Sequence, residues 1–335
     1  MNRVLWIDQL RGFCMMAILW FHTEMYYAGS DVTPYALYVG DVLATFFFLS
    51  GYLFLSGKSF SARSKMMTIV RRLIIPYFFF TLLFVLPKAI VHDEMNELST
   101  MIIKIFLGQS SWFLSALIVG ELLFVLLIQL TKGKDLYIGL FAILCLVMAG
   151  IIGNHYSPWL NPYNYWHINE AILACFLMSA GFLFQKHERR IRAYAIRIQA
   201  YAIRAYAIRP YIILLLIFLL LKLVIIRNGM EMVLGSIHAS NYPVFIADLL
   251  VSILLMISIF RYIPKISFMQ WTGQRSLVYY FICGGVPLIV AMSFNKFGWP
   301  YSGYLSLLMA FIVVYLLSSL LTFAIYKYLP FIIGK

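Results

Sequence analysis

Long runs of hydrophobic residues alternate with short polar segments along the whole chain of 335 residues. A helix of about 20 apolar residues crosses the hydrocarbon core of a bilayer, which is about 30 Å thick. The runs that approach this length are 7–27, 38–56, 73–91, 112–131, 136–153, 168–185, 210–227, 243–260, 275–293 and 303–326. The pattern predicts an all-α protein, a polytopic transmembrane bundle of about ten helices that forms a single domain over residues 1–335.

The composition supports a membrane protein and excludes several other classes. Hydrophobic residues make up 63% of the chain and charged residues only 12%, whereas about a quarter of a soluble domain is charged. The net charge of +13 is spread over short loops, so no soluble basic face is left to bind nucleic acid. The four cysteines lie within apolar runs without the spacing of metal ligands, and we predict no metal site. No cleavage site follows the first apolar run, and we expect it to be retained.

Basic residues are concentrated in every second loop, which sets the predicted orientation. One side carries Lys58, Arg63, Lys65, Arg71, Arg72, Lys132, Lys134, the segment 186–209, Arg261, Lys265, Arg275, Lys327 and Lys335. The other side carries only Lys88, Lys104, Arg227 and Lys296. Because cytoplasmic loops are enriched in lysine and arginine, we predict that both termini are cytoplasmic.

The segment 186–209 is predicted to be a basic cytoplasmic loop, and it contains the sequence AYAIR at 193–197, 200–204 and 205–209. Arg190, Arg197 and Arg204 recur every seven residues, as they would in a short interfacial helix on anionic lipid. A tandem duplication that lengthened a tolerant loop explains the repeats equally simply, and we adopt that interpretation.

The first apolar run contains the strongest candidate catalytic residues, Asp8, Arg11 and His22. Asp8 and Arg11 are three residues apart and can pair on one helix face. Arg11 and His22 are eleven residues apart, close to three helical turns, so they share a face at a separation of about 16 Å along the axis. Imidazole has a pKa of about 6.5 and can accept a proton from a hydroxyl group. A structural, hydrogen-bonding histidine is the alternative.

Five short motifs follow one another in a recognisable order. They are IDQLRG at 7–12, FFFLSGYLF at 46–54, RRLIIPY at 71–77, SWFLSAL at 111–117 and TGQRSLVYY at 272–280. Each motif is weak alone, but the ordered series resembles the membrane acyltransferase 3 family over most of the chain. The chain departs from the usual family pattern at Ile69, where a second basic residue is common, and at Cys283, where many members have histidine.

The resemblance implies transfer of an acyl group, commonly acetyl, from cytoplasmic acyl-coenzyme A (acyl-CoA) to a hydroxyl group beyond the membrane. Acyl-CoA would be the donor substrate, with no permanently bound cofactor. His22 would be the general base or acyl relay, and Arg11 would orient the donor. Arg72, with Arg71 beside it, would bind the coenzyme A phosphates, since arginine binds phosphate in bidentate fashion. Simple positive-inside anchoring remains the alternative for Arg71 and Arg72.

Several other polar and aromatic residues are candidates for substrate contacts. Ser50 and Tyr52 can offer hydroxyl groups to a pocket or simply pack between helices. Trp112 can line the acyl path or anchor its helix at the membrane interface. Glu121 and Asp248 lie within or near apolar runs, where charged residues usually have a function, but the sequence assigns them none.

The sequence thus predicts a multi-pass O-acyltransferase of the bacterial cytoplasmic membrane that acetylates a sugar or glycan. Its partners would be acyl-CoA, the hydroxyl acceptor and the lipid bilayer. A secondary transporter of a small polar solute is the alternative, and it would usually show repeated halves or paired broken helices. The lengths of the apolar runs and loops show no such two-half symmetry.

Overall fold

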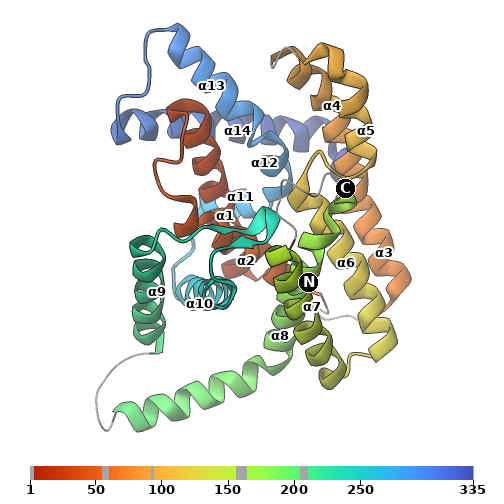
Figure 1. Cartoon of the computed structure of the whole chain (residues 1–335), viewed down its shortest axis with the longest axis vertical. Coiled ribbons are helices and arrows are strands. Elements are labelled where there is room, and N and C mark those ends of the chain that lie inside the picture. The colour runs from red at the N-terminus through yellow and green to blue at the C-terminus, as the bar shows by residue number, and fades with distance from the viewer. Residues whose placement is uncertain (1–3, 55–59, 92–93, 156–163, 204–209, 335) are drawn as a thin grey trace.

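The computed structural model describes residues 4–54, 60–91, 94–155, 164–203 and 210–334. Helices dominate these residues, as the hydrophobic pattern predicts (Figure 1). Their bounds are α1 Leu5–Thr23, α2 Val39–Tyr52, α3 Ala62–Ile69, α4 Ile75–Val91, α5 Leu98–Phe106, α6 Trp112–Thr131, α7 Asp135–His155, α8 Ile168–Ile203, α9 Pro210–Arg227, α10 Tyr242–Phe260, α11 Ser267–Gly273, α12 Ser276–Ile282, α13 Gly285–Lys296 and α14 Tyr304–Tyr328. A small antiparallel hairpin pairs β1 Met232–Val233 with β2 His238–Ala239.

Within the described residues, six helical segments are long and apolar enough to cross a membrane. They are Ala62–Val91, Trp112–Thr131, Asp135–Gly153, Tyr165–Glu188, Tyr242–Phe260 and Tyr304–Tyr328. Helices α12 and α13 meet at an angle of 47° and would form a seventh span as a broken pair. The polytopic helical fold is therefore confirmed. The number of ten spans and the cytoplasmic location of the termini stay predictions.

Helix α1 lies inside the bundle and connects its parts (Figure 1). It packs against α2, α10, α11 and α14, while α2 packs in turn against α8. Helices α6 and α7 also pack against α8 and complete that side of the bundle. One large hydrophobic cluster joins these helices, and it includes Leu10, Met15 and Ile18 of α1. The polar residues of α1 are thus placed among neighbouring helices rather than against lipid.

The crossing of α1 with α11 depends on two glycines. A Cβ atom on Gly12 would lie 1.9 Å from the carbonyl oxygen of Met269, and one on Gly273 would lie 1.8 Å from that of Asp8. No side chain fits at either position, because the clash is with backbone. Small residues allow membrane helices to approach this closely. The glycines of the first and last motifs therefore bring α1 and α11 into backbone contact.

The crossing of α2 with α8 follows the same principle. A Cβ atom on Gly51 would lie 1.9 Å from the carbonyl oxygen of Met178, and one on Gly181 would lie 2.0 Å from that of Phe48. Gly51, in the second motif, therefore allows α2 and α8 to approach closely.

Helix α8 continues far beyond the predicted span 168–185, for 36 residues in all. At about 1.5 Å per residue it is about 54 Å long, and its far end projects away from the bundle (Figure 1). The segment predicted to be a basic cytoplasmic loop is thus helical over residues 186–203, and its cytoplasmic location stays a prediction. Alanine, glutamine and arginine favour helix, and no glycine or proline interrupts this segment before Pro210. The AYAIR copy at 205–209 lies outside the described residues.

We expect Gly51→Ala to destabilise the protein by about 1–3 kcal/mol, because the new methyl group overpacks the crossing with α8. The measurement is the apparent melting temperature of detergent-purified protein, followed by size-exclusion chromatography after heating. Gly139→Ala in α7 is the matched control, since a Cβ there meets nothing within 4 Å. Equal melting temperatures for the two variants would contradict the close crossing.

Candidate active site

A cavity of about 550 Å³ opens along the first three turns of α1. Its polar lining comes from helices that are far apart in the sequence: Asp8, Arg11, Lys65, Arg72, Gln274, Ser276, Tyr280 and Tyr326. Its apolar lining includes Met15, Ile18, Phe46, Phe113, Leu114 and Leu117. All five sequence motifs contribute residues to this lining.

Asp8 and Arg11 both line this cavity, but each is bound to the region of α11 and α12. The Asp8 carboxylate accepts a hydrogen bond of 2.9 Å from Nε2 of Gln274, and Nη2 of Arg11 donates one of 3.2 Å to Oγ of Ser276. Among the ion pairs of the described residues, none joins Asp8 to Arg11. The close crossing at Gly12 brings these partners within hydrogen-bonding distance. Asp8 and Arg11 are therefore held by residues outside α1.

Three cationic side chains, those of Arg11, Lys65 and Arg72, contribute to the lining of the cavity. Lys65 lies above the ring of Phe54 at 4.5 Å from its centroid. Ile69, which stands where the family often has a second basic residue, is a buried core residue. Lys65, one turn earlier on the same helix, supplies a positive charge to the cavity instead.

Arg71 and Arg72 occupy different positions although they are neighbours in the sequence. Arg72 lines both the main cavity and an adjoining open groove, whereas Arg71 lines only the groove. The groove also contains hydroxyl groups and a further arginine: Ser61, Arg63, Ser64 and Thr68. Both arginines are exposed, but only Arg72 shares the lining of the main cavity with Arg11.

His22 lies beyond the inner end of the cavity, on the same helix. Arg11, Met15 and Ile18 all line the cavity, and His22 follows Ile18 by one further helical turn, about 6 Å along the axis. The imidazole ring is half-buried and stacks with the ring of Tyr26, with centroids 6.4 Å apart. No hydrogen bond recorded among the described residues involves its nitrogens. Contact of the imidazole with a substrate stays a prediction.

Ser50, Tyr52 and Trp112 are not among the described residues that line the cavity. The Ser50 hydroxyl donates to Glu121 of α6, and the Tyr52 hydroxyl donates to Glu188 of α8 at 2.6 Å. The indole of Trp112 packs against Gly235. These contacts join helices and give all three residues a structural role, while their contact with substrate stays a prediction.

Sequence reasoning did not single out Gln274, Ser276 or Tyr280 as site residues, although all three belong to the last motif. Tyr280 lines the cavity and shares a hydrogen bond of 2.8 Å with the hydroxyl group of Ser111. Cys283, at the position where many family members have histidine, directs its thiol to the carbonyl oxygen of Tyr280 at 2.9 Å. The available signal in the sequence was the run of polar residues that follows Gly273 within this motif.

One known protein family matches the chain. A family model described as an acyltransferase domain matches residues 4–327, which is nearly the whole chain. No curated protein and no solved structure gives a significant match. The family match includes both the cavity and His22. The chain therefore belongs to the acyltransferase 3 family and is a membrane acyltransferase.

Proposed function

We propose that the protein is an O-acyltransferase of the bacterial cytoplasmic membrane. It transfers an acetyl group from cytoplasmic acetyl-CoA to a hydroxyl group of an extracytoplasmic sugar or glycan. The supporting observation is the cavity along α1, with cationic side chains at one part and an apolar lining that leads towards His22. Because the chain belongs to an acyltransferase family, we favour this function over that of a transporter.

The cationic part of the cavity suits the phosphate groups of the donor. Arg11, Lys65 and Arg72 face a single lining carboxylate, that of Asp8, which is already bound to Gln274. Arginine and lysine form strong, charge-assisted hydrogen bonds with phosphate oxygens. A volume of about 550 Å³ falls in the usual range of ligand pockets. The donor binds as a substrate and leaves as free coenzyme A.

The apolar lining suits the acyl end of the donor. Met15 and Ile18 line the cavity between Arg11 and His22, so the pantetheine arm and its thioester extend along this face of α1. His22 accepts the proton of the acceptor hydroxyl group as the oxygen attacks the thioester carbonyl carbon. The carbon–oxygen bond forms, the carbon–sulfur bond breaks, and the thiolate leaving group takes up the proton.

We expect His22→Ala to reduce acetyl transfer by at least about 100-fold, because loss of a general base costs about 10²–10⁴-fold. The measurement is transfer of radiolabel from acetyl-CoA to glycan extracted from cells that lack the gene. His238→Ala is the control, since His238 forms an exposed ion pair with Glu231 in the hairpin. Full activity of correctly inserted His22→Ala would refute the proposed role.

We expect Arg72→Gln to raise the KM for acetyl-CoA about tenfold, with little change in kcat, because it removes about 1–2 kcal/mol of binding energy. Arg71→Gln should have a smaller effect, since Arg71 lines only the outer groove. Steady-state kinetics of the purified variants provide the measurement, with Arg227→Gln at the end of α9 as control. A larger effect of Arg71→Gln than of Arg72→Gln would overturn this assignment.

A further inference from the structure

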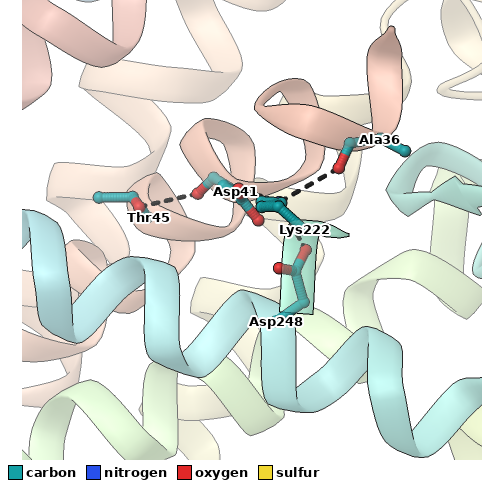
Figure 2. A network of polar contacts seen from close by, with 5 residues as sticks. All are labelled: Ala36, Asp41, Thr45, Lys222 and Asp248. Carbon is teal, nitrogen blue, oxygen red and sulfur yellow. Dashed lines mark hydrogen bonds and ion pairs between the residues drawn. The ribbon is translucent and has the colours of Figure 1, made fainter. Parts of the chain in front are cut away.

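Three charged side chains from three helices meet inside the bundle (Figure 2). Nζ of Lys222 in α9 lies 2.7 Å from Oδ2 of Asp41 in α2 and 2.7 Å from Oδ2 of Asp248 in α10. Lys222 and Asp248 are 5% and 2% exposed, and Asp41 is 5% exposed. Burying such a cluster is costly even when the charges are paired. We call these three residues the Lys222 cluster.

The Lys222 cluster ties α9 to the rest of the bundle. Most of the large side chains of α9 are exposed on the outer surface: Ile213, Leu215, Leu216, Leu219, Leu220, Leu223 and Ile226. Figure 1 accordingly shows α9 at the edge of the molecule. Lys222 and Ile225 are buried instead. A hydrophobic residue could fill this position without the cost of burying charge, so packing alone does not explain a lysine here.

Lys222 makes a third contact, to the segment that connects α1 with α2. Its Nζ donates a hydrogen bond of 3.1 Å to the carbonyl oxygen of Ala36, which lies in the short 3-10 helix Tyr35–Leu37 (Figure 2). The ammonium group therefore joins this connecting segment to α2 and α10. Asp41 holds the start of α2 in the same cluster.

A second buried charge anchors the same connecting segment from the side of α1. Glu24 has no exposed surface, and its Oε1 accepts hydrogen bonds from the backbone nitrogen of Thr33 at 3.1 Å and from Nε1 of Trp20 at 2.7 Å. Its Oε2 accepts one of 3.2 Å from the hydroxyl group of Tyr38. The segment is thus bound near both of its ends by charged groups.

The anchored segment reaches His22 through the ring of Phe21. The ring of Tyr35 meets that of Phe21 edge to face at a centroid distance of 5.4 Å, and the Phe21 ring lies 5.6 Å from the imidazole of His22. A continuous set of contacts therefore runs from Lys222 through Ala36 and Tyr35 to Phe21. We call Tyr35 and Phe21 the wall beside His22.

We propose that Lys222 is a positioning residue for the acceptor side of the active site. Through Ala36 it holds Tyr35 against Phe21 and so fixes the wall beside His22. The proposal rests on the proposed function for its statement about the acceptor. The anchoring itself does not depend on any substrate. A charged group suits this task because its hydrogen bonds are strong and directional. Apolar contacts alone would allow the connecting segment to shift along the neighbouring helices.

The test compares the reactivity of His22 in variants of the full-length protein. Lys222→Met combined with Asp248→Asn removes one positive and one negative charge and leaves the formal charge of the Lys222 cluster unchanged. We expect diethyl pyrocarbonate to modify His22 several-fold faster in this double variant than in the wild type, as measured by mass spectrometry. Lys222→Arg keeps the charge and the donor, and it should restore a rate near that of the wild type.

Two further variants make the result specific. Tyr35→Leu leaves the Lys222 cluster intact but removes the ring contact, so His22 should again be modified faster; it also decides the question if the double variant does not fold. Glu188→Gln breaks a different ion pair, with Arg261 at 2.9 Å, and should leave the rate unchanged. Wild-type rates for Tyr35→Leu and the double variant, or an equal rise with Glu188→Gln, would overturn the proposal.

Kinetics separate the positioning role from the proposed function. With acetyl-CoA and the extracted glycan as substrates, Lys222→Met/Asp248→Asn should raise the KM for the glycan several-fold and leave that for acetyl-CoA unchanged. An unchanged KM for the glycan would refute the effect on the acceptor side. If the wild type transfers no acetyl group, the proposed function fails, while the modification rates still decide whether Lys222 anchors the wall beside His22.

Discussion

Helix α1 crosses α11 at Gly12 and Gly273 so closely that no Cβ atom fits between the two backbones. This contact joins the beginning of the chain to a segment more than 250 residues later, and the polar residues of both helices meet beside it. Asp8 and Arg11 find their partners there, in Gln274 and Ser276. The crossing thus holds these side chains in the wall of the cavity. Without it, α1 would carry unpartnered charges inside an apolar bundle.

The low polarity of the bundle explains how its other charges are arranged. A buried charge without partners is expensive, so each must be paired or hydrogen-bonded. Glu24 accepts three hydrogen bonds, and Lys222 is shared between two carboxylates and a backbone carbonyl group. Glu121 is bound by Ser50. The pairings of Lys222 and Glu121 connect different helices, and those of Lys222 and Glu24 bind the segment between α1 and α2.

The two ends of α1 therefore have different surroundings and different tasks. Arg11 lines a cavity of about 550 Å³ whose lining also includes Lys65 and Arg72. Around His22 the neighbours are aromatic rings, and the adjoining segment is fixed by buried charges. One continuous helix sets the distance between Arg11 and His22 at about 16 Å along its axis. In the proposed reaction, this rigid spacing lets a donor from one side of the membrane meet an acceptor from the other.

The sequence by itself determined the features that depend on local order. Helical periodicity placed Arg11, Met15 and Ile18 on one face, and hydropathy and the motif series identified a membrane acyltransferase. The tertiary structure decided which residues become partners: Lys65 enters the cavity, Tyr52 turns to Glu188, and Lys222 meets Asp41 and Asp248. Lys222 and Asp41 were overlooked because a single charge in an apolar run does not identify its partner. The period of a helix follows from its own backbone, whereas contacts between distant residues depend on how helices cross.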